Sequence, residues 1–419
     1  ECGYGWKYDN TDQVWASDAV QNSKLGYNGQ PQSVLTRDIT KNWRNANTLT
    51  YDNKKLFDGR DKLNVLLGHE VSSSQETSLE NTSVAFPGTM TIDEVLANMG
   101  AGTALPTQTT ISAKDNMLSF FGRVNYTLMD KYLLTVTVRA DGSSKFAKGN
   151  QWGVFPSAAL AWRLSDEAFM KGTQDWLSNL KVRLSYGTAG NNRISSGLMY
   201  TTYTMAGNTG KAPFFDETRG AMLEHGSNLY NPNLKWETTI TRNIGFDYGF
   251  FNNRLSGSLD LYWNTTKDLL MKTEIPSNTG YSYQYQNFGK TSNKGVELTL
   301  NAVLADKAKW GLNFNFNISY NRNRIDELST ENPWQSSNWS GSTIAKYEDY
   351  RVEEGGRLGE IWGYKTNGFY TAYDPVTNPN GELVLNGTSW ELREGIKDNS
   401  YSMAGGKPYP GQLKYECDE

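Results

Sequence analysis

The sequence predicts an all-β protein: an antiparallel, up-and-down transmembrane β-barrel, incomplete, with long extracellular loops and short periplasmic turns. Three observations predict it. Apolar and polar residues alternate with period two. Short turns and long polar connections follow one another along the chain, and aromatic residues lie near the ends of the alternating segments. The 419 residues contain no apolar run near the ~18 residues that a membrane-spanning helix needs.

The strands are predicted from the alternation. It is clearest in 312–320, where every even position from Leu312 to Tyr320 is apolar and every odd position is polar. Four other segments alternate as clearly: 134–139, 180–186, 255–264 and 296–300. Less regular candidates are 61–70, 118–129, 153–165 and 239–250. A strand buried on both faces would be apolar throughout, so these strands have one apolar and one wet face.

The two faces of the predicted strands have different neighbours. The apolar faces are expected to point to lipid. The wet faces are expected to point to the barrel lumen or to a plug inside it. Their candidate side chains are Arg139, Lys181, Arg183, Asp260, Glu297, Asn313, Asn315 and Asn317.

The connections support a barrel over a soluble sandwich, which mixes loop lengths between its two ends. Tight hairpins are predicted at 130–131, 251–254 and 305–309, and long polar connections at 140–152, 188–236, 265–292 and 321–346. The link 165–179 lies on the side of the short turns and is predicted to hold a short amphipathic helix. The polar segment 73–110 is predicted to be a long loop excursion with a short helix at 91–96.

Aromatic residues lie near the limits of the apolar stripes. They are Tyr126, Trp162, Tyr186, Trp236, Phe250, Phe251, Trp263, Trp310 and Tyr320. Two girdles of amphipathic rings are typical of a transmembrane barrel. Ordinary cross-strand packing of aromatic rings is the alternative. The asymmetry of the hairpins favours the girdles.

Several kinds of chemistry are not predicted. The 41 basic and 45 acidic residues give a net charge of -4, without the basic excess of a nucleic-acid binder. His69 and His225 have no ligand at metal-binding spacing, so no metal site and no cofactor are expected. Paired carboxylates such as Asp326-Glu327 point to opposite faces of a strand, so no glycosidase pair and no catalytic residue are assigned. The segment 374–381 resembles a fragment of a calcium loop but lacks the closing Glu, which favours a plain turn.

Two loop tryptophans are the candidate substrate-binding residues. Trp334 and Trp339 lie in a Ser/Asn-rich segment. Flat aromatic faces stack on sugar rings and line peptide sites, while Asn and Ser supply hydrogen bonds. The alternative is a loop folded on its own aromatic anchors.

A series of motifs resembles the SusC/RagA-type TonB-dependent outer-membrane transporters. The segment 139–146 reads RADGSSKF, as in the family pattern R-x-D-G-S-S-x-F. The others, in order, are WGVFPS (152–157), AWRLSDE (161–167), KVRLSYGTAGN (181–191), NPNLKWE (231–237), TKDLL (266–270), Ile275-Pro276 and NKGVEL (293–298). Each motif alone is weak, but the ordered set runs along nearly the whole chain and is specific.

The resemblance implies a large barrel in the bacterial outer membrane that contains an N-terminal plug. It implies import driven by the inner-membrane TonB complex, a SusD-like lipoprotein that caps the barrel, and oligosaccharide or, in some members, peptide as cargo. Residues 1–419 are expected to be part of the barrel domain, without plug, TonB-binding segment and last strands. The PGQLKY segment at 410–415 resembles the lead into a family loop, but 416–419 depart from that pattern.

Two other classes of protein stay open on the residues alone. One is a surface adhesin or carbohydrate-binding β protein, and the other is a β-rich glycan-degrading enzyme. The alternation of short turns and long loops favours the transporter over both.

Overall fold

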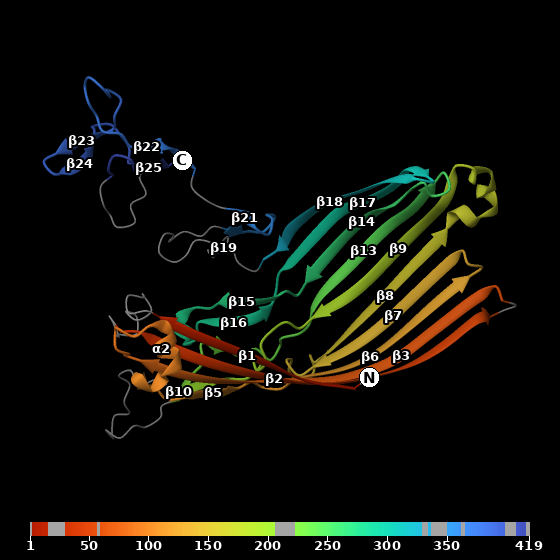
Figure 1. Cartoon of the computed structure of the whole chain (residues 1–419), viewed down its shortest axis with the longest axis horizontal. Coiled ribbons are helices and arrows are strands. Elements are labelled where there is room, and N and C mark those ends of the chain that lie inside the picture. The colour runs from red at the N-terminus through yellow and green to blue at the C-terminus, as the bar shows by residue number, and fades with distance from the viewer. Residues whose placement is uncertain are drawn as a thin grey trace. The chain divides into compact units, whose positions relative to one another are not determined.

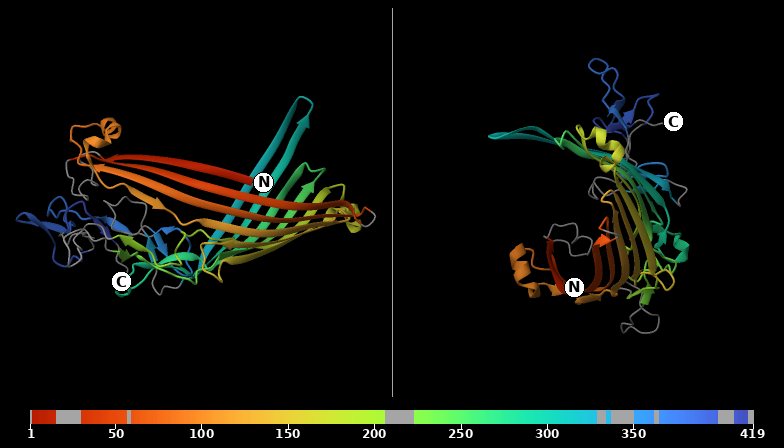
Figure 2. Two further views of the ribbon diagram at one scale, coloured as in Figure 1. Left: turned by 90° about the horizontal axis from the view of Figure 1, so that it is seen from below. Right: turned by 90° about the vertical axis from the view of Figure 1, so that its right-hand side faces the viewer.

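The structure is a computed structural model that describes residues 2–15, 30–56, 59–205, 223–328, 334–336, 350–361, 365–398 and 408–415. It forms two compact units, 1–329 and 330–419. The first unit is built on one large antiparallel sheet whose long strands lie side by side and curve together (Figures 1 and 2). Among the described residues, no helix is long and apolar enough to cross a membrane.

Each long strand of the sheet pairs with the strand that precedes or follows it among the long strands. In spatial order these are β1 (Cys2–Trp15), β2 (Gln32–Leu56), β3 (Asp61–Val84), β6 (Asp115–Leu128), β7 (Tyr132–Ser143), β8 (Trp152–Arg163), β9 (Leu177–Asn191), β13 (Glu237–Phe250), β14 (Leu255–Lys267), β17 (Lys290–Lys307) and β18 (Trp310–Glu327). This is the up-and-down order that the alternation predicted. β1 and β18 form the two edges of the described sheet, which is not closed.

Short elements complete the two units. The first unit adds α2 (Ile92–Ala97), β4 (Thr103–Ala104), β5 (Gln108–Ile111), β10 (Tyr203–Met205), β11 (Leu223–His225), β12 (Asn228–Leu229), β15 (Leu270–Glu274) and β16 (Tyr283–Asn287). The second contains β19 (Trp334–Ser336), β20 (Tyr350–Val352), β21 (Glu360–Ile361), β22 (Thr366–Phe369), β23 (Leu383–Asn386), β24 (Ser389–Leu392) and β25 (Leu413–Tyr415). In Figure 1 the short turns of the sheet lie at its right-hand end, and α2, β15 and β16 lie at the opposite, long-loop end.

All nine predicted strand segments are confirmed, and most are longer than predicted. The tight turns are confirmed as well: three residues, 129–131, connect β6 to β7, and two of them, Met129 and Asp130, have positive φ. The predicted helix at 91–96 is α2, which starts with a capping box in which Thr91 and Glu94 bond each other's backbone N–H.

Three expectations about connections are wrong, and two strands were missed. β3 continues to Val84, so 73–84 is strand and not loop; its serine-rich end is held by backbone pairing with β2. The connection 140–152 is short, because β7 runs to Ser143 and β8 starts at Trp152. The link after β8 contains two 3₁₀ helices, Leu164–Asp166 and Ala168–Thr173, instead of an amphipathic α-helix. β1 and β2 were not predicted at all.

The two faces of the sheet separate as predicted. Register places Lys181, Arg183, Asp260 and Glu297 on one face, together with Asp247. The opposite, outward face carries exposed apolar side chains: Leu67, Val124, Val136, Val138, Leu160, Leu184, Val296, Phe316 and Ile318. An apolar surface of this extent on a sheet with a polar reverse face is what a lipid-facing wall requires.

Exposed aromatic rings border this apolar face at two levels. Trp152 and Trp162 on β8 are ten positions apart, as are Trp176 and Tyr186 around β9, and Trp310 and Tyr320 on β18. Ten residues span about 33 Å along a strand. At the ~40° tilt of barrel strands this becomes ~25 Å of height, the height of the apolar band in outer-membrane barrels. The girdle prediction holds for five of its exposed members: Trp162, Tyr186, Trp263, Trp310 and Tyr320.

Trp236 is an exception to the girdle prediction. It is 7% exposed and belongs to a buried cluster with Phe146, Phe155, Ile194 and Leu234 at the long-loop end. Its indole Nε1–H donates to the carbonyl of Gln151 at 2.9 Å. Here the alternative, ordinary packing, is correct.

Glycines face aromatic rings directly across several strand pairs. The pairs are Gly68 with Phe121, Gly142 with Trp152, Gly257 with Tyr248, and Gly295 with Tyr262. A Cβ at Gly68 would lie 2.4 Å from the Phe121 ring, and one at Gly295 would lie 2.3 Å from the Tyr262 ring. Each ring therefore lies over its glycine, where any other residue would displace it.

Glu167 organises the turn that follows β8. Its carboxylate accepts bonds from the Tyr132 hydroxyl (2.6 Å), the Trp162 indole N–H (3.1 Å) and the Lys131 ammonium (3.2 Å). These donors, the Tyr132 hydroxyl first, lower the pKa of Glu167 from 4.5 to about 2. The carboxylate ties the girdle ring of Trp162, and the Tyr132 ring stacked on it, to the turn.

The Glu167 contacts predict a pH dependence. Because the pKa is lower in the folded than in the unfolded chain, the carboxylate stabilises the turn fully above pH ~4.5, and this is lost as the pH falls toward about 2. Glu167→Gln should therefore lower stability above pH ~4.5, and the difference should vanish near pH 2. Tryptophan-fluorescence unfolding of the complete receptor measures both. A difference that stays the same at every pH would show a steric effect instead.

Candidate substrate-facing surface

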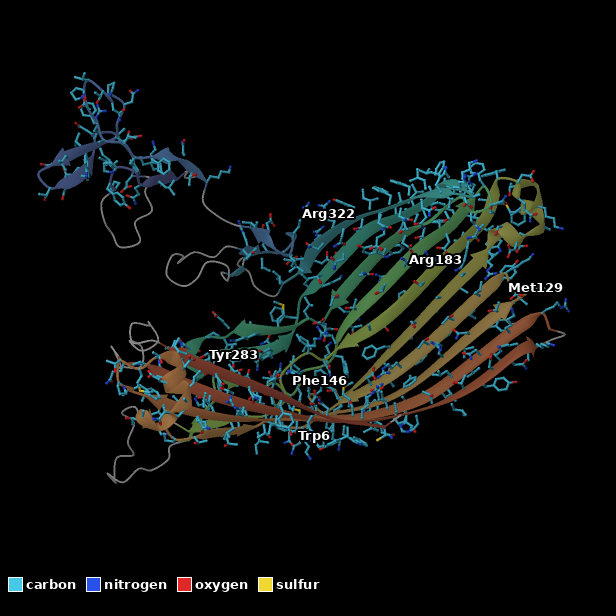
Figure 3. The ribbon with its side chains drawn as sticks, viewed as in Figure 1. Trp6, Met129, Phe146, Arg183, Tyr283 and Arg322 are labelled. Carbon is cyan, nitrogen blue, oxygen red and sulfur yellow. The ribbon has the colours of Figure 1, made fainter. Side chains whose placement is uncertain are left out.

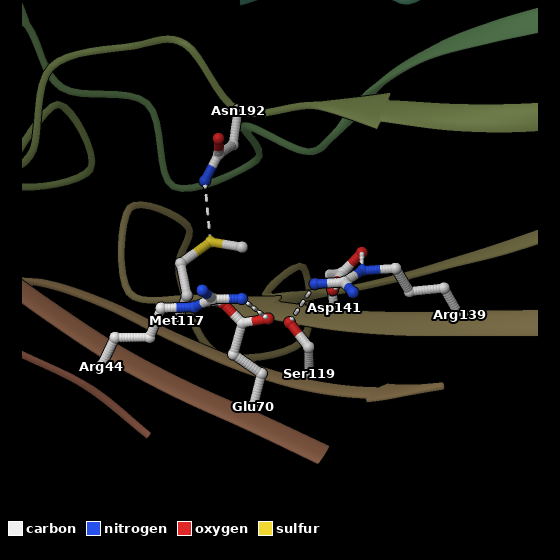
Figure 4. Close-up of polar contacts among 7 residues, drawn as sticks. All are labelled: Arg44, Glu70, Met117, Ser119, Arg139, Asp141 and Asn192. Atoms are coloured by element: carbon white, nitrogen blue, oxygen red, sulfur yellow. Dashed lines mark hydrogen bonds and ion pairs between the residues drawn. The ribbon is translucent and has the colours of Figure 1, made fainter. Parts of the chain in front are cut away.

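One cluster of charged and polar side chains lies on the inward face near the long-loop end (Figure 4). Arg139 Nε donates to both carboxylate oxygens of Asp141 at 2.7 and 2.9 Å, and its Nη2 donates to Ser119 Oγ at 2.9 Å. Ser119 and Asp141 are buried. Beside them Arg44 forms a two-pronged bond with Glu70, at 2.7 and 3.1 Å. Bidentate pairs of this kind hold their side chains in a fixed geometry.

A second cluster lies on the same face, nearer the short turns, and its side chains come from three neighbouring strands. Arg183 of β9, labelled in Figure 3, donates from Nε to Asp247 of β13 at 3.0 Å and from Nη2 to Asp260 of β14 at 3.0 Å. Lys181 also pairs with Asp247, at 3.3 Å. The guanidinium passes over Gly245, whose added Cβ would lie 2.6 Å from Arg183 Cζ. The charges of Lys181, Arg183, Asp247 and Asp260 therefore neutralise one another and form a fixed polar wall.

The buried cluster around Trp236 supports the loops above this wall. The rings of Phe146 and Phe155 lie 5.4 and 5.5 Å from that of Trp236. Tyr285 and Leu270 pack against the cluster from β16 and β15. This apolar core fixes the positions of the segments 227–236 and 268–289, which were predicted only as long polar connections.

An amide-lined hollow of about 600 Å³ opens between these two segments. It is lined by Leu229, Tyr230, Asn231, Pro232, Asn233, Lys235, Gln284, Gln286 and Asn287. Asn231 and Asn287 hold its frame: Asn231 Nδ2 donates to the Tyr285 carbonyl at 2.9 Å, and Asn287 Nδ2 to the Lys235 carbonyl at 2.8 Å. Lys235 is paired with Asp268 at 2.9 Å. The hollow is therefore polar without a net charge of its own.

The hollow was not predicted as a site. Its signal in the sequence is the run Tyr283-Gln284-Tyr285-Gln286-Asn287, where rings and amides alternate. Alternation on β16 places the rings on one side and Gln284 and Gln286 on the other. The Gln286 amide donates to Gln284 Oε1 at 2.7 Å, which leaves further amide capacity facing the hollow.

The two predicted substrate-binding tryptophans belong to the second unit. Trp334 lies in β19 of the second unit, where its backbone pairs with Val352. Trp339 lies outside the described residues.

The other sequence candidates have ordinary surroundings. His69 contacts Asn47 at 3.3 Å, and the His225 ring lies 4.4 Å from that of Tyr281. Within the described ranges, no group of three or more His, Cys, Asp or Glu is placed to hold a metal ion. Asp374 accepts the backbone N–H groups of Thr377 (2.7 Å) and Val376 (2.8 Å), which lower its pKa. The segment 374–381 is thus a side-chain-stabilised turn, as predicted.

The chain is similar to known outer-membrane receptors. A family model described as "TonB dependent receptor-like, beta-barrel" matches residues 3–403. TonB-dependent receptor SusC of Bacteroides thetaiotaomicron is 36% identical over 283 residues, 67% of this chain and 27% of that protein. TonB-dependent receptor P3 of Formosa agariphila is 32% identical over 352 residues, 84% of this chain and 33% of that protein.

Solved structures agree with the sequence relatives. The structure titled "Structure of the RagAB peptide transporter" matches with a TM-score of 0.67 and 25% identity over 88% of this chain and 38% of that chain. The chain spans 27% and 33% of the length of the two curated relatives. The match from residue 3 to 403, with the open up-and-down sheet and its two girdles, shows that the chain belongs to the TonB-dependent receptor β-barrels, outer-membrane receptors and transporters and not enzymes.

Proposed function

We propose that the chain is part of the barrel domain of an active importer that carries oligosaccharides across the bacterial outer membrane. The importer would draw energy from the TonB complex and work with a SusD-like surface lipoprotein. Residues 1–419 would form one part of that barrel. A plug and a TonB-binding segment would belong to the complete receptor.

The observation that carries the oligosaccharide proposal is the amide-lined hollow, in a chain that is 36% identical to SusC. Amide groups donate and accept hydrogen bonds at once, as sugar hydroxyls do. Tyr230 is 43% exposed and offers a ring for stacking beside them. A volume of about 600 Å³ lies within the range of small-molecule sites. Because Lys235 is neutralised by Asp268, the lining favours a neutral glycan over an acidic one.

Peptide import is the second candidate. It is favoured by the likeness to the RagAB peptide transporter at 25% identity. A peptide would also use the amides, through its backbone, but its charged ends would find no uncompensated charge in the hollow. The fixed polar wall below the hollow suits either cargo.

Calorimetric titration of the complete receptor with its capping lipoprotein separates the two candidates. Neutral oligosaccharides, acidic oligosaccharides and peptides would each be titrated. Binding of neutral oligosaccharides supports the proposal. Binding of peptides alone would replace it with the second candidate, and binding of neither by a folded complex would contradict both.

Tyr230→Ala tests the hollow itself. Loss of one stacking ring should weaken oligosaccharide binding about tenfold, the size expected for ~1–1.5 kcal/mol of aromatic contact. Tyr203→Ala is the matched control, since Tyr203, the first residue of β10, is an exposed tyrosine (64%) that does not line the hollow. Equal affinities of both variants would remove the hollow from the binding site.

Trp334 and Trp339 remain proposed contacts elsewhere on the cargo's path. Separate Trp334→Ala and Trp339→Ala variants in the same titration test them. Unchanged affinity in both would favour the alternative, in which the rings anchor their own loop.

A further inference from the structure

An outward-facing row of side chains crosses five strands at the aromatic girdle nearer the long loops, here called the upper girdle. Tyr186, Arg242, Trp263, Lys294 and Arg322 stand directly opposite one another in turn on β9, β13, β14, β17 and β18. Rings and cations alternate from Tyr186 to Lys294, and a second cation, Arg322, ends the row. The next row toward the short turns is Leu184, Ile244, Leu261, Val296 and Tyr320, which begins the apolar band.

This row faces outward, away from the lumen. Alternation places Lys294 on the face of Val296 and Leu298, and Arg322 on the face of Tyr320 and Ile318. The inward charges Arg183, Asp260 and Glu297 are on the other face. Cargo inside the barrel cannot contact the row.

Two adjoining hollows lie along the row at β17 and β18. One, of about 610 Å³, has a mainly apolar lining that includes Trp263, Val296 and Tyr320, and it shares Lys294 and Arg322 with the other. The other, of about 230 Å³, is lined by Ser292, Lys294, Arg322, Arg324 and Asp326. Three cations against one carboxylate make this smaller hollow net positive.

The cations of the smaller hollow are weakly compensated. Arg324 and Asp326 approach each other only to 3.7 Å. For Lys294 and Arg322 no carboxylate lies within ion-pair distance among the described residues. On the inward face, in contrast, Lys181 and Arg183 pair with two aspartates at 2.9–3.3 Å. Unpaired cations beside exposed rings, just above an apolar band, complement an amphiphile with a phosphorylated head.

We propose that the two hollows bind a phosphorylated lipid of the outer leaflet, with its phosphate among Lys294, Arg322 and Arg324 and its acyl chains along Trp263, Val296 and Tyr320. The head group lies above the girdle and the chains follow the apolar band, so the site has the polarity of the leaflet itself. Ser292 adds a hydroxyl donor to the phosphate oxygens. The proposal does not depend on the identity of the cargo.

The test uses the complete receptor, purified in detergent and titrated with bisphosphorylated lipid A under native mass spectrometry. The variant Lys294→Gln/Arg322→Gln/Arg324→Gln should bind on the order of 100-fold more weakly, since three basic contacts with an anionic head group are lost. The matched control is Lys171→Gln/Lys307→Gln/Lys309→Gln, the same charge change at the short-turn end, and it should bind as the unmodified receptor does. All these positions lie outside the apolar band, so both triple variants are expected to fold like the unmodified receptor. Electrophoresis of unheated samples verifies this, because the variants should then migrate as the unmodified receptor does.

A further variant should change the affinity for lipid A in the opposite direction. Asp326→Asn removes the one carboxylate of the charged hollow and should tighten lipid A binding severalfold. Dephosphorylated lipid A and inorganic phosphate complete the panel, and both should bind far more weakly than lipid A. Equal binding of dephosphorylated lipid A would overturn the phosphate site. Inorganic phosphate binding as tightly as lipid A would point to a soluble anion instead of a lipid, and unchanged binding by the triple variant would overturn the proposal altogether.

Discussion

Phe316→Arg is expected to impair assembly of the barrel in the membrane, at a cost of about 2–4 kcal/mol. Phe316 lies on β18 between the girdle residues Trp310 and Tyr320, and its ring is 42% exposed on the outward face, stacked 6.4 Å from Phe314. An arginine there would place a charge near the middle of the lipid. Urea titration of the complete receptor refolded into lipid vesicles measures the cost.

The neighbouring residue provides the control. Asn315 has the same place along β18 but the opposite face, so Asn315→Arg would face the lumen and should cost much less. Both variants add the same side chain to adjacent positions. Equal tolerance of the two would contradict the assignment of the apolar face to lipid.

Gly257→Ala is expected to destabilise the barrel by about 2–3 kcal/mol. The added methyl carbon would lie 1.9 Å from the Thr299 carbonyl oxygen and 2.6 Å from the Tyr248 hydroxyl. That hydroxyl donates to the same carbonyl at 3.0 Å, so the methyl group displaces the bond as well as the strand. Backbone cannot move aside as a side chain can, and the same refolding titration should show the loss.

Gly5→Ala serves as the comparison. Gly5 also lies in a strand, β1, but a Cβ there has no atom within 4 Å. The same chemical change should then be neutral or slightly stabilising, because alanine restricts the unfolded chain. If both variants behaved alike, the crowding at Gly257 would not control stability.

Strand identity could be predicted where one face touches lipid and the other does not. β18 and β9 alternate because their surroundings differ on their two sides. The end of β3 does not: Ser72, Ser73 and Ser74 are polar on both faces and are held by backbone bonds to β2 and β6. β2 was missed for a similar reason, since most of its residues are polar. β1 did carry a signal, the alternating rings of Tyr4, Trp6 and Tyr8.

The candidate site was less predictable than the fold. The inward charges followed from alternation, but their partners did not, because Arg183 reaches Asp260 across a whole strand. The hollow depends on two loop segments held together by a core that includes Trp236 and Phe146. These residues are 90 positions apart and carry no periodic pattern. Trp236 looked like a girdle residue because a strand end and a loop core use the same kind of side chain.

The glycines that face aromatic rings have a consequence for assembly. Alternation excludes a slip of one residue between neighbouring strands, because the faces would be exchanged, but it tolerates a slip of two. A two-residue slip would bring Phe121 to Leu66 or Glu70 instead of Gly68, and Tyr262 to Asn293 or Glu297 instead of Gly295. Each ring would then meet a side chain where it now has open space. These pairs therefore disfavour the two-residue mispairings that the lipid-facing pattern alone would allow, and they fix the alignment of neighbouring strands even where a long connection joins them.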